Sequence, residues 1–314
     1  MNWAVGAALV FGAGTFWSLG GLLMRLMEAA GPWQILLYRS VAMGVFFLVL
    51  LTVSGSLARF RGGWPLVVAG LCVGCAFVGF VFSVTNTTIA NTFFLLATQP
   101  LLTALLAWRI LGEVPDSRTW TAMAIALAGV ACMVLDGIAQ GTLFGNAMAL
   151  VSALGFAALT VTLRRNRHLD MRPGFALGGL FTAGFAGTAL LLTTGAESVA
   201  VLQEAFKISN RDLTLCLLSG TVQIGLGMLL FTLGTRRISA GEAALIALSE
   251  VVLAPIWVWL VVNEIPSGLT LIGGGILLTG LLFRAWPKRL SPSAGPISTN
   301  MRPSSPSNER EEAK

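Results

Sequence analysis

The sequence predicts an all-α integral membrane protein of ten transmembrane helices in two inverted five-helix repeats, with both termini in the cytoplasm. Of its 314 residues, 55% are hydrophobic and 11% are charged, whereas soluble domains carry about 25% charged residues. The mean hydropathy is +0.82. Ten apolar runs follow one another along the chain, and part of the first half recurs in the second half.

The apolar runs approach or exceed the length of about 20 residues with which a helix crosses the hydrocarbon core of a bilayer. The first run lacks a preceding basic segment and is too long for a cleavable signal peptide, so we expect it to remain as the first span. The expected spans are residues 3–26, 34–53, 64–85, 90–111, 118–135, 143–163, 174–194, 213–233, 240–262 and 268–286.

An internal repeat relates spans four and five to spans nine and ten at an offset of 151 residues. Glu250 aligns with Gln99, so both copies carry a polar residue near mid-span. The identical pairs include Trp108 and Trp259, Glu113 and Glu264, Pro115 and Pro266, Thr119 and Thr270, and Gly129 and Gly280.

The repeat predicts two five-helix units, residues 1–136 and 137–286. The remaining segment, residues 287–314, is rich in proline, serine and charge. Such a composition cannot bury enough apolar surface to fold. We therefore expect this segment to be a disordered cytoplasmic tail.

The basic residues predict the orientation, because cytoplasmic loops of membrane proteins are enriched in lysine and arginine. With the N-terminus inside, all but four of the 20 basic residues fall on the cytoplasmic side. The four on the outer side are Arg25, Arg39, Lys207 and Arg211. The net charge of +6 thus reflects membrane orientation, and no nucleic-acid partner is expected. Because five is an odd number, the repeats lie inverted, as in many secondary transporters.

Glu250 is the principal candidate for function. It lies in the middle of an apolar span, where a charged residue costs roughly 2.5–3.5 kcal/mol on insertion scales. Acids inside the membrane usually face an interior cavity and carry function. Alanines and Trp257 share its helical face, which leaves space beside the carboxylate. We expect Glu250 to bind a proton or an amine; the alternative is a buried ion pair that only orients helices.

The fourth span carries a stripe of uncharged hydrogen-bonding residues, Thr92, Gln99 and Thr103. Pro100 follows Gln99, and a proline inside a helix removes one backbone hydrogen bond and displaces the carbonyl four residues earlier. A kinked helix with free carbonyl groups suits a binding site or a hinge. Glu113 and Glu264, at the ends of spans four and nine, are interpreted as turn residues at the membrane boundary.

Arg39 is the third candidate, about 8 Å into the second span from its outer end. It follows Tyr38, the only tyrosine of the chain. A long arginine side chain can extend back to the membrane interface, or it can reach inward toward Glu250. Gln223, near the middle of the eighth span, is a further candidate for lining a solute path.

Catalysis and metal binding are not expected. The only histidine, His168, lies in a basic loop, which excludes a histidine-based metal site. Cys72 and Cys75 form a Cys-x-x-Cys pattern inside an apolar span, where free cysteine packs as a small hydrophobic residue. An enzyme would need a nucleophile with its base, or metal ligands. We therefore expect neither catalytic residues nor a cofactor.

Three short motifs accompany the ten spans in two halves: Leu111-Gly112-Glu113, Ala128-Gly129-Val130 and Tyr38-Arg39-Ser40. The whole pattern resembles the EamA-type members of the drug/metabolite transporter (DMT) superfamily. Asn263 departs from that pattern, because the second copy usually has glycine before the glutamate. The resemblance implies a central cavity lined by spans 1–4 and 6–9, with spans 5 and 10 as scaffold.

From these observations we expect a multi-pass transporter of the inner cell membrane whose partners are a small organic solute, protons and membrane lipid. The solute is expected to be amino-acid-like or amphipathic, exported by alternating access and coupled to protons through Glu250. Only Arg39 among the basic residues is placed to reach a cavity, which disfavours a polyanionic solute. The alternatives are a channel, which would need rings of carbonyls or charges, and a multi-span protein without transport activity.

Overall fold

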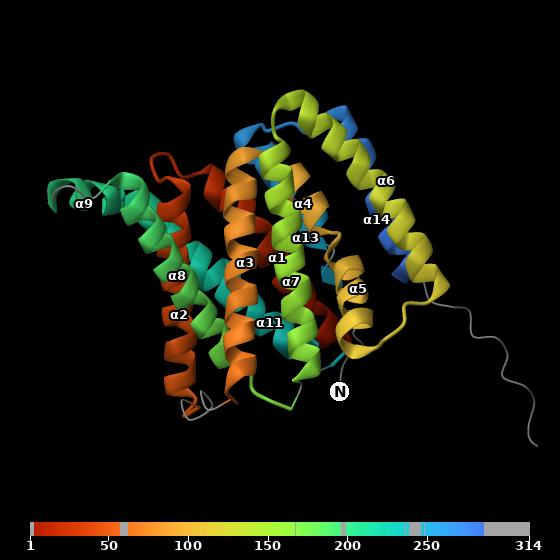
Figure 1. Cartoon of the computed structure of the whole chain (residues 1–314), viewed down its shortest axis with the longest axis horizontal. Coiled ribbons are helices and arrows are strands. Elements are labelled where there is room, and N and C mark those ends of the chain that lie inside the picture. Colours follow the sequence, from red (N-terminus) through yellow and green to blue (C-terminus); the bar gives the residue numbers. More distant parts are fainter. Residues whose placement is uncertain are drawn as a thin grey trace, which may run out of the picture.

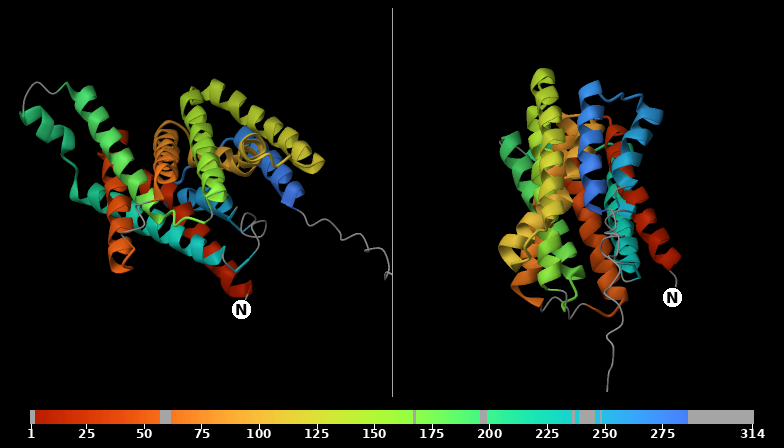
Figure 2. Two further views of the ribbon diagram at one scale, coloured as in Figure 1. Left: turned by 60° about the horizontal axis from the view of Figure 1, so that its bottom comes forward. Right: turned by 90° about the vertical axis from the view of Figure 1, so that its right-hand side faces the viewer.

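The computed structural model describes residues 3–56, 62–166, 168–195, 199–235, 237–238, 246–247 and 249–285. Within these ranges the chain is helical and contains no strand (Figures 1 and 2). Eight of the described helical stretches are long and apolar enough to cross a membrane, and two shorter apolar helices follow them near the C-terminus. The expected tail and most of the first turns of the expected ninth span lie outside the described residues.

The first half of the chain contains α1 (Trp3–Arg25), α2 (Pro32–Val53), α3 (Trp64–Asn86), α4 (Ile89–Leu96), α5 (Gln99–Leu111) and α6 (Ser117–Gln140). The second half contains α7 (Leu143–Arg165), α8 (Arg172–Thr194), α9 (Val199–Phe206), α10 (Asn210–Leu218), the π-helix η2 (Ser219–Leu226), α11 (Gly227–Gly234), α13 (Ser249–Val262) and α14 (Gly268–Ala285).

The expected fourth span is broken into two helices. The helix α4 ends at Leu96 and α5 begins at Gln99. Pro100 explains the break, because it cannot donate a backbone hydrogen bond to the carbonyl of Leu96 and its ring clashes with that carbonyl. The two helices together form one stretch, Ile89–Leu111, long and apolar enough to cross a membrane, and the kink expected at Pro100 divides the polar stripe of this span between them.

The expected eighth span is also not one regular helix. It begins at Asn210, three residues earlier than expected, where the Ser209 hydroxyl accepts a hydrogen bond from the Asp212 N–H at 3.0 Å. Its middle, Ser219–Leu226, is a π-helix, a rare form that is frequent at functional sites. The short helix α9 between α8 and α10 was not expected.

The helices pack in pairs that have counterparts when the two halves are exchanged. The helix α2 packs on α8, and α6 packs on α14. The contact of α3 with α7 corresponds to that of α1 with η2 and α11, and the contact of α1 with α13 corresponds to that of α7 with α4 and α5. The interior is thus built from contacts between the halves.

The first helices of the two halves run in opposite directions. At the beginning of α7, Asn146 accepts a hydrogen bond from the hydroxyl of Thr87 at 2.9 Å. The carbonyl of the same Thr87 accepts from Arg25, at the end of α1, at 2.8 Å. The beginning of α7 therefore lies beside the end of α1, and the N-terminus lies at the opposite end of the bundle (Figure 1).

A buried polar cluster ties the α6–α14 pair to the rest of the bundle. Asp136 of α6 accepts hydrogen bonds from Ser267, which caps α14, and from Thr270 of α14. The hydroxyl of Thr270 also lies 2.6 Å from the Asn91 side-chain oxygen in α4, and Asn91 donates to Asn146 at 3.3 Å. The ends of four helices, α4, α6, α7 and α14, meet at this cluster, whose hydrogen bonds satisfy polar groups that lipid could not.

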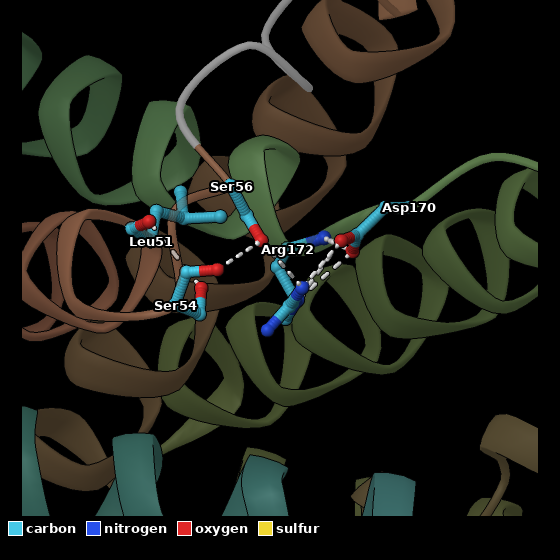
Figure 3. Close-up of polar contacts among 5 residues, drawn as sticks. All are labelled: Leu51, Ser54, Ser56, Asp170 and Arg172. Carbon is cyan, nitrogen blue, oxygen red and sulfur yellow. Dashed lines mark hydrogen bonds and ion pairs between the residues drawn. The ribbon is translucent and has the colours of Figure 1, made fainter.

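A second polar junction joins α2 to α8 (Figure 3). The guanidinium of Arg172, the first residue of α8, binds Asp170 at 2.7 Å and donates to the Ser56 hydroxyl at 3.4 Å. Ser56 donates in turn to the carbonyl of Ser54, just beyond α2, at 3.1 Å. The start of α8 is thereby anchored at the end of α2.

Glycine permits the tight contact between α3 and α7. A Cβ on Gly79 would lie 2.5 Å from the Ser152 nitrogen and 2.7 Å from the Met148 carbonyl oxygen. Beside it, the Ser152 hydroxyl donates to the Ala76 carbonyl at 2.7 Å. Because the obstructing atoms belong to the backbone of α7, neither helix can yield by a side-chain rotation.

We predict that Gly79→Val destabilises the purified protein by about 1–3 kcal/mol, the usual cost of overpacking. Thermal unfolding in detergent measures it. The matched control is Gly184→Val in α8, where a Cβ would meet nothing within 4 Å. Equal effects of the two substitutions would show that the α3–α7 contact is not the cause.

Candidate functional site

The candidate site lies around α1, which is packed between α13 on one side and η2 with α11 on the other. Glycines of α1 allow α13 and η2 to pack closely against it. A Cβ on Gly14 would lie 2.6 Å from the Ser249 hydroxyl and 3.6 Å from the Glu250 nitrogen, and a Cβ on Gly20 would lie 2.8 Å from the Gln223 side-chain nitrogen. Residues of both halves therefore meet along this one helix.

Glu250 lies in the first described turn of α13 and is partly buried. Among the described residues, its carboxylate makes no hydrogen bond or ion pair. The hydroxyl of its neighbour Ser249 is buried and also lacks a hydrogen-bond partner. The described part of the chain contains no ion-pair partner for Glu250, and its role in binding stays a prediction.

Trp257 lies two turns beyond Glu250 and is held by α1. Its ring nitrogen donates to the Ser18 hydroxyl at 3.0 Å, and Ser18 donates to the Thr15 carbonyl at 2.7 Å. The indole is therefore fixed in orientation against α1. It can serve as a rigid aromatic wall, while its polar group is already occupied.

Gln223 lies in η2 and is occupied by protein contacts. Its side-chain oxygen accepts from the Ser219 hydroxyl at 3.0 Å, and its nitrogen donates to the Trp17 carbonyl of α1 at 3.3 Å. The side chain is almost fully buried. In this conformation Gln223 joins η2 to α1 through both ends of its amide.

The polar stripe of the fourth span is mostly satisfied locally. The Thr92 hydroxyl bonds to Ser83 at 2.8 Å and to the Thr88 carbonyl at 3.1 Å. Thr103 donates to the carbonyl of Gln99 at 2.8 Å. Gln99 itself is partly buried at the break before α5, and its side-chain amide makes no hydrogen bond among the described residues.

Tyr38 and Arg39 are neighbours in α2, but their side chains contact different parts of the structure. The Tyr38 hydroxyl donates to the carbonyl of Phe206 at 2.5 Å, so it anchors the segment between α9 and α10. Arg39 is 2% exposed and therefore does not extend to the interface. It also forms no ion pair with Glu250. Its guanidinium instead lies over two phenylalanine rings, Phe77 and Phe80, of α3.

Two ion pairs between the halves were missed by sequence reasoning, which took both glutamates as turn residues. Arg25, at the end of α1, binds Glu264 at 2.7 Å, and Glu264 also accepts from the Ile89 N–H at 2.7 Å. Arg164, near the end of α7, binds Glu113 at 2.7 Å. The signal was available, because the glutamates are aligned in the repeat and each arginine lies in the last turn of the first helix of its half.

The two ion pairs lie at opposite ends of the bundle. Arg25 also donates to the carbonyl of Thr87, which lies beside Asn146 at the start of α7. Arg164 lies 18 residues later in the same helix, about 27 Å along its axis. Each pair thus joins the first helix of one half to the loop after the fourth span of the other half, once at each end.

Comparison with known proteins places the chain among membrane transporters. The model of the EamA-like transporter family matches residues 4–135 and 143–285. The uncharacterized transporter YwfM of Bacillus subtilis (strain 168) is 26% identical over 276 residues, covering 86% of this chain and 90% of YwfM. An uncharacterized transporter of Vibrio cholerae serotype O1 is 30% identical over 187 residues, covering 56% of this chain and 59% of that protein.

A solved structure shares the fold. The crystal structure of a protein superposes with a TM-score of 0.64 at 18% sequence identity, covering 90% of this chain and 98% of that chain. At this identity the likeness concerns the fold alone.

Proposed function

Because the chain belongs to the EamA-like transporter family, we propose that it is a secondary transporter that carries a small amphipathic organic solute by alternating access. Residues 1–136 and 137–286 form the two inverted repeats, with ten spans and both termini in the cytoplasm. The protein acts as an exporter in the cell membrane, and Glu250 couples transport to protons. A channel is disfavoured, because a lone carboxylate makes a poor filter.

One observation carries this proposal: an ion pair between the halves at one end of the bundle has a counterpart at the other end. Alternating access requires each end to open in turn around a fixed site. The pairs Arg25–Glu264 and Arg164–Glu113 each join the two halves at one end. Opening one end would separate one pair and leave the other intact.

The site residues follow from the same arrangement. Glu250 and Trp257 belong to α13, which packs on α1, the helix along which the halves meet. Gln99 lies at the break between α4 and α5. Arg39 supplies positive charge within the bundle. Thr92, Thr103, Tyr38 and Gln223 support the surrounding helices through the hydrogen bonds they make.

The test has two steps. A thermal-shift screen of the purified protein against pools of metabolites identifies a solute, because bound solute stabilises the folded state by mass action. Proteoliposomes loaded with that solute should then take up labelled solute by counterflow, with saturation. Uptake that never saturates and shows no counterflow would identify a channel and overturn the proposal.

A further inference from the structure

Arg39 is a buried cation whose hydrogen-bonding capacity is largely unused. It lies in the third turn of α2 and is 2% exposed. Its Nε and Nη1 atoms are buried and make no hydrogen bond. A guanidinium keeps its charge in proteins and presents five donors in a planar fork. An orphaned group of this kind requires an explanation.

The surroundings of Arg39 are aromatic. The central guanidinium carbon lies 5.0 Å from the centroid of the Phe77 ring and 5.1 Å from that of the Phe80 ring. Phe80 in turn packs edge-on against Phe93 of α4 at 5.8 Å. Cation–π contacts offset part of the cost of burying the charge, but ring faces accept no conventional hydrogen bond from the N–H fork.

No acid of the described chain neutralises Arg39. Asp212 of α10 uses both carboxylate oxygens to accept from the backbone N–H groups of residues 28–30, at 2.9–3.1 Å. Glu28, Glu113, Asp170, Glu204 and Glu264 each bind another arginine or lysine. Glu250, which binds none, does not pair with Arg39 either.

We propose that Arg39 binds the carboxylate of the transported solute, whose apolar body packs against Phe77 and Phe80. A carboxylate accepts two parallel hydrogen bonds from a guanidinium, the geometry for which the free Nε–H and Nη–H groups are suited. One cation binds one anionic group, so the solute carries a single carboxylate. This assignment rests on the proposed transport function and specifies its substrate class.

Binding in detergent tests the assignment without requiring transport. Four probes share a six-carbon chain: hexanoate, 2-aminohexanoate, hexanamide and hexylamine. At a probe concentration of about ten times Kd, the two carboxylates should raise the Tm by roughly 2–4 °C. Hexanamide and hexylamine should not. Sodium chloride at the same concentration is a further arm, because an inorganic anion could also occupy the fork.

Variants identify the residue responsible. Arg39→Met should abolish the carboxylate response and leave the Tm of the free protein unchanged or higher, because it removes an unpaired buried charge. Arg39→Lys keeps the charge without the planar fork and should weaken the response at least tenfold. Arg211→Met, at an exposed arginine that pairs with Glu28, is the matched control and should respond as the wild type does.

Several outcomes overturn the assignment: no response to either carboxylate, an equal response to hexanamide or to chloride, or a full response in folded Arg39→Met. If Arg39→Met does not fold, the response of Arg39→Lys decides. Counterflow of a solute without a carboxylate would refute this substrate class and leave the transport function standing. Carboxylate binding without any counterflow would refute the transport function and leave the assignment of Arg39 to a carboxylate standing.

Discussion

Replacing Glu250 by glutamine is expected to abolish the pH dependence of transport while the protein still folds. Glutamine has nearly the same size and polarity but cannot take up a proton. In the wild type, a carboxylate that must change its ionisation state during the cycle makes the rate vary by up to about tenfold per pH unit on the limiting side of its titration. In Glu250→Gln this variation should disappear.

The measurement is the initial rate of counterflow in proteoliposomes at a series of pH values, using the solute identified by the stability screen. Glu204→Gln is the matched control, since it makes the same chemical change at an exposed acid paired with Lys207. The control should keep the wild-type profile. If Glu250→Gln also keeps it, Glu250 is not the coupling residue.

The structural basis of this prediction is the lack of a competing role for Glu250. Its carboxylate makes no hydrogen bond or ion pair within the described ranges, whereas Glu264 and Glu113 are both engaged by arginines. Removing the charge at position 250 therefore breaks no described contact, and a change in transport would not be a side effect of unfolding.

Neutralising the two ion pairs one at a time is expected to shift the accessibility of the interior in opposite directions. Arg25 and Glu264 are 28% and 20% exposed, and Glu264 also accepts a backbone hydrogen bond. Loss of this pair by Glu264→Gln should cost about 1–2 kcal/mol, which changes the ratio of the two states by roughly 5–30-fold.

The second pair is weaker, because Arg164 and Glu113 are 51% and 48% exposed. Exposed ion pairs contribute about 0.2–1 kcal/mol, so Glu113→Gln should shift the same ratio by about fivefold at most. The direction is opposite, because this pair closes the other end of the bundle. The two effects together would identify the pairs as the closing contacts of an alternating-access cycle.

Accessibility can be measured with a reporter cysteine at Ala247, which is partly exposed one turn before Glu250. The reporter is placed in a background whose four native cysteines are replaced by alanine. A membrane-impermeant maleimide is applied to right-side-out and inside-out vesicles. Glu264→Gln should speed labelling from the face near the α13–α14 loop, and Glu113→Gln from the other face. Shifts in the same direction for both variants would contradict the role of the two ion pairs in alternating access.

The helical membrane architecture could be read from local features. Hydropathy predicts where most helices lie, since each span must satisfy its own backbone hydrogen bonds within lipid. The missing N–H of Pro100 predicted a kink in the fourth span, but it did not predict that the span would divide into two helices. By contrast, η2 and α9 carry no local signal that separates them from ordinary helix or loop.

The state of some polar candidates was decided by residues far away in the chain. Thr92 and Thr103 are satisfied by residues close in sequence, whereas Gln223 is bound by the carbonyl of Trp17, which lies 206 positions earlier. Glu264 is paired with Arg25 across 239 positions, although it had been interpreted as a turn residue. Neither partner can be inferred from a hydropathy profile.

By itself the sequence determined that this chain is a membrane protein with a repeated half and an acid in mid-span, because helix formation in lipid and apolar length are properties of short segments. Only the tertiary structure decided which buried polar groups remain available. Arg39 and Glu250 keep unused hydrogen-bonding capacity and Trp257 does not, because satisfying a buried polar group depends on which helices pack beside it.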